Sequence, residues 1–330
     1  MDVLSDVVAI MRSGSPRSAR IAWRAPWGQR FPAVPASVGF HVILQGSCWL
    51  VPPSGGPLAL SVGDVVFFPH GHAYGLADGP ATSLAEPVCD PLEDAELFVS
   101  DSIGHDGPLT VTLCGGYRLE PRHAHPLLSG LPESIHLPAR PGHHPELRAT
   151  IEMLGNEVGN PRLGADIVVL ALLDMLLLYI LRAWFEELPT PVRATGWAAA
   201  LSDPAISAAL QAIHRDPAHR WTVETLAAQA GLSRAAFSRR FTALIGQGPG
   251  TYLAWWRLSI AASMLRATDQ PLSEVATRIG YTSEFAFANA FKRHHGIAPG
   301  KYRSQRTANP ATTREGGLLV NADAVANNST

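Results

Sequence analysis

Short apolar runs alternate with Gly and Pro between residues 39 and 77. The runs FHVILQG, CWLV, LALSVGD and VVFFP are separated by PPSGGP and followed by HGHAYGL. Short apolar runs bounded by Gly and Pro are typical of antiparallel strands joined by tight turns. The pattern predicts several short strands here, and a weaker strand signal returns over residues 109–119.

Helical spacing replaces this pattern from residue 144 onward. Residues 144–158 and 163–187 carry apolar side chains at intervals of three and four, and Gly159-Asn160-Pro161 separates them. Because that tripeptide breaks a helix, two antiparallel helices are predicted. The apolar run 167–181 is shorter than the ~20 residues of a membrane span and contains Asp174. We therefore expect a buried helix and no membrane partner.

The second of these helices is apolar on nearly all sides, so more than one face needs a cover. The β-rich region can cover one face and a second copy of the chain another, which predicts a homodimer. A purely intramolecular core is the alternative. The predicted fold class is α+β, with a small β-barrel or jelly-roll and a helical pair ahead of an all-α C-terminal domain. The predicted divisions are residues 1–140 (β domain), 141–188 (helical pair), 189–204 (linker), 205–306 (all-α domain) and 307–330 (disordered tail).

Charge is distributed unevenly along the chain. The net charge is −2, but residues 206–306 contain thirteen Lys and Arg against five Asp and Glu. Such a basic segment in a nearly neutral chain indicates a polyanionic partner. Three cysteines are too few for a disulfide framework, and the first residues do not resemble a signal peptide, so a cytoplasmic setting is expected.

A short pattern occurs twice within the basic segment. The text LAAQAGLS ends at Ser233 and is followed by Phe237 and Phe241, and VATRIGYTS ends at Ser283 and is followed by Phe287 and Phe291. A Gly permits a tight turn, a Ser caps the next helix, and two Phe at i and i+4 dock that helix. Each copy therefore predicts a helix-turn-helix.

The second helix of a helix-turn-helix enters the DNA major groove. A helix predicted over residues 252–266 joins the two copies, so both reading helices could enter successive major grooves, about 34 Å apart. Double-stranded DNA is therefore the predicted partner. The outward positions are Arg234, Ser238, Arg239, Glu284, Asn289, Lys292 and Arg293.

The second copy resembles the signature of the AraC/XylS family of bacterial transcription regulators. The matching positions are Gly280-Tyr281, Ser283, Phe287, Phe291-Lys292-Arg293, Gly296, Pro299 and Tyr302-Arg303. The resemblance implies a sequence-specific regulator, an activator by family tendency, which contacts RNA polymerase. With the helix caps and outward charges, it implies these DNA-binding residues: Ser233, Arg234, Ala235, Ser238, Arg239, Ser283, Glu284, Phe285, Ala286, Asn289, Lys292 and Arg293.

The N-terminal part resembles the cupin-type sensor domains of such regulators, through HVILQGSCWL, LSVGDVVFFPHGHAYGL and LCGGYRLEPRHAHPLLSGLP. The resemblance implies a domain that senses a signal, such as a small-molecule effector. A metal-dependent cupin enzyme with an accessory DNA-binding domain is the alternative. Tyr74 stands where that enzyme needs a histidine ligand, and the first motif retains only His41. We therefore expect no enzyme and no cofactor.

Three kinds of sensing residue are candidates. An effector pocket in the barrel would use Trp27, Phe40, His41, Trp49, His72 and Tyr74, although each could simply fill the barrel. Oxidant sensing would use Cys48, Cys89 or Cys114, of which the first and last lie in apolar strands and Cys89 in an acidic loop. An unusual zinc or copper site would use Cys114, His123, His125 and His136, whose spacing fits no standard pattern.

Overall fold

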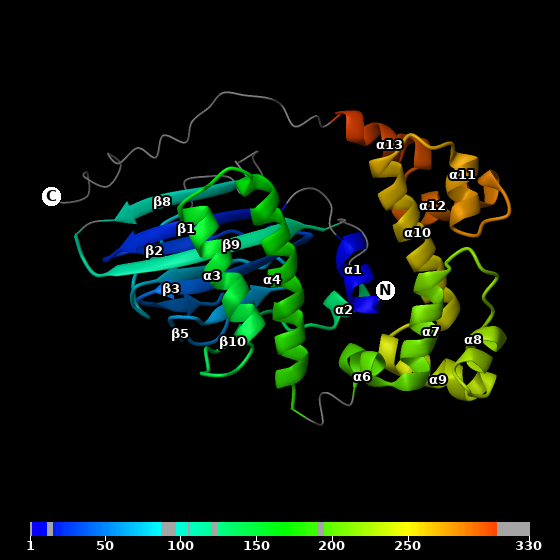
Figure 1. Ribbon diagram of the computed structural model, residues 1–330, viewed down its shortest axis with the longest axis horizontal. Helices are drawn as coiled ribbons and strands as arrows, with labels where there is room; N and C mark the ends of the chain where they lie inside the picture. The colour runs from blue at the N-terminus through cyan, green and yellow to red at the C-terminus, as the bar shows by residue number, and fades with distance from the viewer. Residues whose placement is uncertain are drawn as a thin grey trace.

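A β-rich half and a helical half lie side by side, with the N-terminal helix between them (Figure 1). The computed structural model describes residues 2–11, 16–86, 97–104, 106–119, 125–189 and 195–308. Cys89 and His123 lie outside these residues, as do residues 190–194 of the predicted linker and most of the predicted tail, whereas residues 196–202 of that linker are helical. The α+β class predicted from the sequence is confirmed.

Two sheets form the β-rich half. The larger has the order β10-β6-β3-β9-β1-β8 and the smaller β2-β7-β4-β5. The pair β1 and β8 is parallel, and the other paired strands within the two sheets are antiparallel. The strands are β1 (Arg17–Arg24), β2 (Gly28–Phe31), β3 (Ser37–Gln45), β4 (Ser47–Val51), β5 (Leu58–Ser61), β6 (Val65–Phe68), β7 (Tyr74–Ala77), β8 (Phe98–Gly104), β9 (Leu109–Arg118) and β10 (Ile135–Leu137).

The side chains on the two faces of strand β3 belong to two different apolar cores. Successive side chains of a strand point to opposite faces, and five of the nine residues of this strand are buried, four of them consecutive. Val38, Phe40 and Val42 pack on the side of the helices, whereas Ile43 packs between the sheets with residues of β1, β4 and β6. A strand buried on both faces reads as a continuous apolar run, as FHVIL does.

Helices α3 (Pro145–Gly159) and α4 (Ala165–Glu187) pack together across the face of the larger sheet (Figure 1). Asp174, in the middle of the apolar helix, accepts a hydrogen bond from the Tyr117 hydroxyl at 3.0 Å, which satisfies a polar group on the packed side. Length and apolar composition alone would also let α4 cross a membrane, a test that core helices of soluble proteins pass too.

One face of α4 remains uncovered in the single chain. Ile167 is 75% exposed, and Val168 and Met175 are also exposed, together with Leu163 just before the helix. Large apolar side chains gathered on one face often mark a protein interface.

The helical half contains α6 (Gly196–Ser202), α7 (Pro204–Arg215), α8 (Val223–Gln229), α9 (Arg234–Ile245), α10 (Pro249–Ala267), α11 (Leu272–Arg278), α12 (Glu284–His295) and α13 (Pro299–Ala308). The short helix α2 (Pro126–Ser129) and the N-terminal helix α1 (Val3–Met11) belong to the β-rich half in sequence, and α1 contacts α4, α7 and α10. The 19 residues of α10 span about 28 Å, and α10 contacts both α9 and α12.

The helices of the helical half belong to two apolar cores, of which one extends into the β-rich half and the other does not. Phe237, Phe241 and Tyr252 belong to the same buried cluster as Val38 of β3 and Leu177 of α4. Residues of α11, α12 and α13 form a second cluster with the C-terminal part of α10, including Leu258 and Leu265. We call these the shared core and the distal core. The first helix-turn-helix is thus built onto the N-terminal domain, whereas the second has a core of its own.

Candidate nucleic-acid interface and sensor site

Both predicted turns have the local geometry that a helix-turn-helix requires. Gly231 between α8 and α9 has φ +66°, and Gly280 between α11 and α12 has φ +81°, a region that side chains disfavour. The Ser233 hydroxyl accepts a hydrogen bond from the Ala236 N–H at 3.3 Å, and Ser283 Oγ accepts one from the following helix at 3.1 Å. The predicted helix caps are confirmed.

Four phenylalanines hold the two reading helices in place. Phe237 and Phe241 of α9 and Phe287 and Phe291 of α12 are fully buried. The rings within each pair lie 5.5 and 5.6 Å apart, in tilted and edge-on arrangements that aromatic pairs favour. Their packing fixes which side of each helix faces outward.

The predicted DNA-contacting residues lie on those outward sides. Ser238 is half-buried, and the others are exposed: Ser233, Arg234, Ala235, Arg239, Ser283, Glu284, Phe285, Ala286, Asn289, Lys292 and Arg293. Phe285 is 78% exposed, so it does not rest on its own domain. An apolar ring held in water at the start of a reading helix is available for contact with another molecule.

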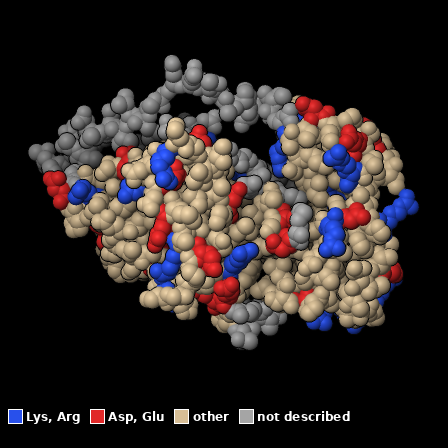
Figure 2. Space-filling model, in the orientation of Figure 1, with Lys and Arg blue, Asp and Glu red and all other residues tan. Residues whose placement is uncertain are grey.

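Ion pairs distinguish the arginines of the first unit. Arg234 Nε lies 2.9 Å from the Glu224 carboxylate of α8, and Arg240 pairs with Asp203. Asp203 also caps α7 by accepting hydrogen bonds from two backbone N–H groups. Arg240 therefore braces α9 against α7. Figure 2 shows basic side chains projecting from the outer edge of the helical half, with acidic groups beside some of them.

Within the cupin-like domain, His41 and Tyr74 meet between the two sheets. His41 Nε2 lies 2.6 Å from the Tyr74 hydroxyl, and Phe31 and Phe68 stack against the Tyr74 ring. Burial lowers the pKa of His41 to about 3, and burial raises the pKa of Tyr74, so both are neutral. His41 Nδ1 is buried and has no hydrogen-bond partner among the described residues. Cys114 lies opposite His41 on β9.

The six predicted pocket residues do not form a single site. Trp27 packs between the sheets, where it stacks on Trp23 at 4.7 Å. Phe40 lies on the opposite face of β3, in the shared core, while Trp49 is half-buried and His72 is exposed. His41 and Tyr74 are the pair that the structure brings into hydrogen-bonding contact.

The cysteine and histidine candidates are dispersed. Cys48 is buried, and burial, with a smaller effect of Asp64, raises its thiol pKa to about 12. The unusual zinc or copper site is not formed by the described residues: His136 lies 3.3 Å from Asp64, and His125 lies at the junction with the helical half. Proximity in sequence does not bring Cys114, His125 and His136 together in space, because they belong to β9, to the segment before α2 and to β10.

That junction contains a polar chain that the sequence did not reveal. His214 of α7 lies 3.2 Å from Asp6 of α1 through Nδ1 and 2.7 Å from the Tyr252 hydroxyl of α10 through Nε2. The same hydroxyl lies 3.5 Å from His125 Nε2. Residues from α1, the segment before α2, α7 and α10 therefore meet in one buried network.

The direction of each hydrogen bond in this network follows from the neutral state of the His125 and His214 imidazoles. Burial lowers the pKa of His125 well below its usual range and that of His214 to about 3. His125 Nδ1 accepts a hydrogen bond from the Leu127 N–H, so its proton is on Nε2, facing Tyr252. Tyr252 then donates to His214, whose Nδ1–H donates to the Asp6 carboxylate. Every member is both oriented and satisfied, which stiffens the junction.

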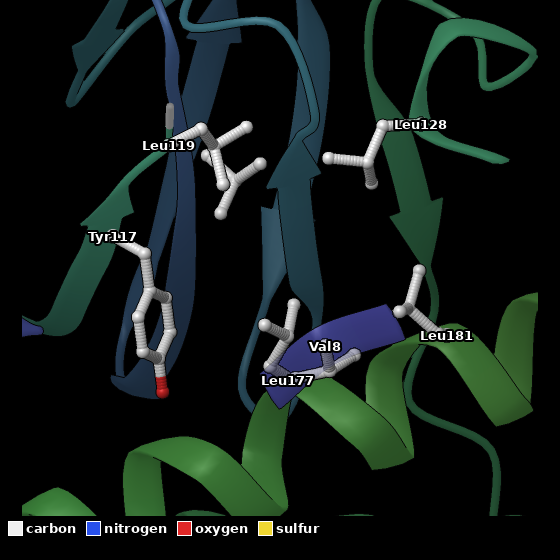
Figure 3. A pocket seen from close by; sticks show the side chains of 7 residues that line it. Val8, Tyr117, Leu119, Leu128, Leu177 and Leu181 are labelled. Atoms are coloured by element: carbon white, nitrogen blue, oxygen red, sulfur yellow. The ribbon is translucent and has the colours of Figure 1, made fainter. Parts of the chain in front are cut away.

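Next to the junction, apolar side chains enclose a small cavity of ≈ 10 Å³ (Figure 3). Val8 of α1 and Leu177 and Leu181 of α4 line it from one side. It has room for about one water molecule. An effector at this position would have to separate α1 or α4 from the sheet.

The two units and their cupin-like partner define a DNA-binding transcription regulator, and comparisons with known proteins agree. A family model described as a cupin matches residues 2–186, and one described as a helix-turn-helix domain matches residues 226–305. A putative AraC-like transcription regulator of Streptomyces lividans is 33% identical over 312 residues, which cover 93% of this chain and 99% of that protein. The chain belongs to the AraC-like transcription regulators, as the sequence signature predicted.

Two further relatives extend the comparison. The RCS-specific HTH-type transcriptional activator RclR of Escherichia coli (strain K12) is 29% identical, covering 86% of this chain and 89% of that protein. The crystal structure of the AdpA DNA-binding domain with a target DNA shares 36% identity, covers 32% of this chain and 95% of that chain, and has a TM-score of 0.31. The named relatives are transcription regulators, and no comparison supports the alternative of a cupin enzyme.

Proposed function

We propose that α9 and α12 read one DNA site together, each from a separate major groove. The observation that carries this proposal is the pair of Ser-capped helices, docked through buried Phe pairs and exposed on their opposite sides. The 19-residue helix α10 contacts both and spans about 28 Å, which is comparable with the ~34 Å between successive major grooves.

The outward side chains suggest distinct roles at the base pairs. Arg239 carries the fork that pairs with guanine, and Asn289 the amide that pairs with adenine. Phe285, being 78% exposed, can contact the methyl group of thymine. Lys292 and Arg293, in the last turn of α12, suit the phosphate backbone.

Gel shifts with Arg239→Ala and Arg293→Ala test this assignment. We expect Arg239→Ala to cost ~1–3 kcal/mol at a specific site and to relax sequence preference, because a bidentate base contact is lost. Arg293→Ala should weaken binding to specific and random DNA alike and reduce the salt slope by ~1.

Arg278→Ala supplies the matched control, because Arg278 is exposed but lies on α11 and pairs with Glu274 at 3.2 Å. It should bind DNA like the wild type. If Arg239→Ala and Arg293→Ala did so too, the assignment of α9 and α12 as reading helices would be wrong.

We propose that the exposed face of α4 pairs two copies of the chain. Ile167 and Met175 supply the apolar surface that this interface would bury. Ile167→Asp should shift sedimentation at micromolar concentration from dimer toward monomer. Val62→Asp, at another exposed apolar position (54%), should not. A monomeric wild type would exclude the homodimer.

We propose that a signal at the cupin-like domain controls an activator in the cytoplasm that contacts RNA polymerase. The name of RclR, a transcriptional activator, supports this direction of regulation. The His41–Tyr74 pair, with its unpartnered Nδ1, supports a small-molecule effector with a polar group. Mass spectrometry of what co-purifies with the full chain, followed by transcription with purified polymerase, tests both parts. Repression of the bound promoter would contradict the activator assignment.

A further inference from the structure

Three side chains with metal-binding atoms meet where α3 begins and α4 ends. They are His143, His144 and Glu187, and one potential ligand atom of each lies within 4.8 Å of the others. His144 Nε2 is 3.1 Å from Glu187 Oε1. The side chains of His144 and Glu187 are 16% and 17% exposed, so the group is only partly accessible to water.

The backbone directs His144 toward α4. This residue precedes Pro145 at the start of α3 and has φ 48° and ψ 57°, in the left-handed region that few residues other than Gly adopt. Its side chain makes no capping hydrogen bond to α3. The imidazole instead contacts the last turn of α4, 43 residues further along the chain.

Two carboxylates lie at the C-terminal end of α4. Glu186 and Glu187 occupy its last turn, which contains no basic residue. The C-terminal end of a helix carries a partial negative charge, so carboxylates there are unfavourable unless a cation is near. Arg140 supplies part of that charge, with its guanidinium 3.5 Å from Glu187 Oε1.

We propose that His143, His144 and Glu187 bind a divalent transition metal of the zinc class, with a water molecule as the fourth ligand. Neighbouring ligand atoms on a tetrahedral zinc ion lie about 3.3 Å apart, close to the 3.1 Å between His144 Nε2 and Glu187 Oε1. For the ion to bind, the exposed His143 ring would turn toward the other two ligands, and the half-exposed Arg140 side chain would move away from Glu187.

Glu186 would not bind the ion itself but would hydrogen-bond to the ligand His144. Its carboxylate lies 3.5 Å from His144 Nδ1. An N–H donated from there would orient the ring and leave Nε2 as the ligand, as is usual for metal-bound histidine. The ion would join the start of α3 to the end of α4, a few residues before the chain passes into the helical half.

Zinc titration of the metal-free full chain, followed by calorimetry and by the visible spectrum of Co²⁺, tests the proposal. We expect one site per chain, with affinity at least about 100-fold weaker in His144→Gln and Glu187→Gln and about 10–100-fold weaker in Glu186→Gln. Arg140→Gln should tighten binding, because a competing cation is removed.

His70 and His72 provide the matched control, since their rings lie 5.6 Å apart, slightly closer than the 6.1 Å of His143 and His144. The double variant His70→Gln/His72→Gln should bind zinc like the wild type. Equal zinc affinity in wild type, His144→Gln and Glu187→Gln, with all three folded by circular dichroism, would overturn the proposal. So would loss of the site in the control variant alone.

Discussion

The two helix-turn-helix units have the same local plan but different surroundings. In the first, Phe237 and Phe241 belong to the shared core, which continues into the N-terminal domain. In the second, Phe287 and Phe291 belong to the distal core, formed by the helical half alone. The comparison teaches that the cupin-like domain packs directly with α9, whereas a proposed signal from that domain would reach α12 only through α10.

The largest expected difference comes from removing one equivalent ring in each unit. Phe241→Ala and Phe291→Ala each delete a fully buried side chain, so each should cost about 3–5 kcal/mol of local stability. Phe241→Ala should also increase hydrogen exchange in α4 and β3, because they share its core. Phe291→Ala should increase exchange in α11–α13 alone, and an equal spread for both variants would abolish the distinction.

The two turn glycines differ in what surrounds them. A Cβ at Gly231 meets no atom within 4 Å, so Gly231→Ala should cost only the left-handed backbone strain, about 1–2 kcal/mol. A Cβ at Gly280 would lie 2.6 Å from the Ala218 carbonyl oxygen, in the loop before α8. Gly280→Ala should therefore cost about 1–3 kcal/mol more, measured by urea unfolding. Equal costs would mean that the second turn does not touch the first unit.

Acidification should lower the stability of the folded chain through its buried neutral histidines. The pKa of His214 is lowered from 6.5 to about 3, so between these values the unfolded chain binds a proton that the folded chain does not. The free energy of unfolding should fall by about 1.4 kcal/mol per pH unit for this residue as the pH drops below 6.5. His41 should add a similar slope, and His125, whose pKa burial also lowers, should add to it.

Urea titrations at pH 7, 6 and 5 measure this slope. His214→Gln should reduce it by about one proton, because it removes one of the three buried neutral imidazoles, His41, His125 and His214. Stability that is unchanged from pH 7 to pH 5 would contradict the burial of these imidazoles in neutral form.

The smallest effects belong to the two caps. Ser233→Ala and Ser283→Ala each remove one hydrogen bond to a helix N-terminus and should each cost about 1 kcal/mol. Differential scanning calorimetry can measure both. Two distinct transitions, of which Ser283→Ala lowers one and Ser233→Ala the other, would sharpen the contrast between the cores.

The helix-turn-helix units were predictable because their determinants are local. Gly280, Ser283 and Phe287 lie within eight residues of one another, and each acts through backbone geometry or i to i+4 spacing. Because Phe287 and Phe291 define the buried face of α12, the opposite face of the helix must be exposed.

Long-range packing limited the rest of the prediction. Strand β1, which pairs with both β8 and β9, has no clear alternation in its sequence, RSARIAWR. The contact between Asp6 and His214 joins residues 208 positions apart, and nothing in either local sequence indicates it. Cys114 and His125 were grouped because they are close in sequence, yet the sheet and the junction separate them.

The shared core has a thermodynamic consequence for operator DNA. Coupling between two sites on one protein is reciprocal: any free energy that an occupied cupin-like domain contributes to DNA binding is contributed equally by DNA to effector binding. Since α9 is packed into the same core as β3 and α4, operator DNA would act as a second ligand of the proposed sensor. The concentration of effector that half-fills the protein would then depend on how much of the protein is already on its promoter.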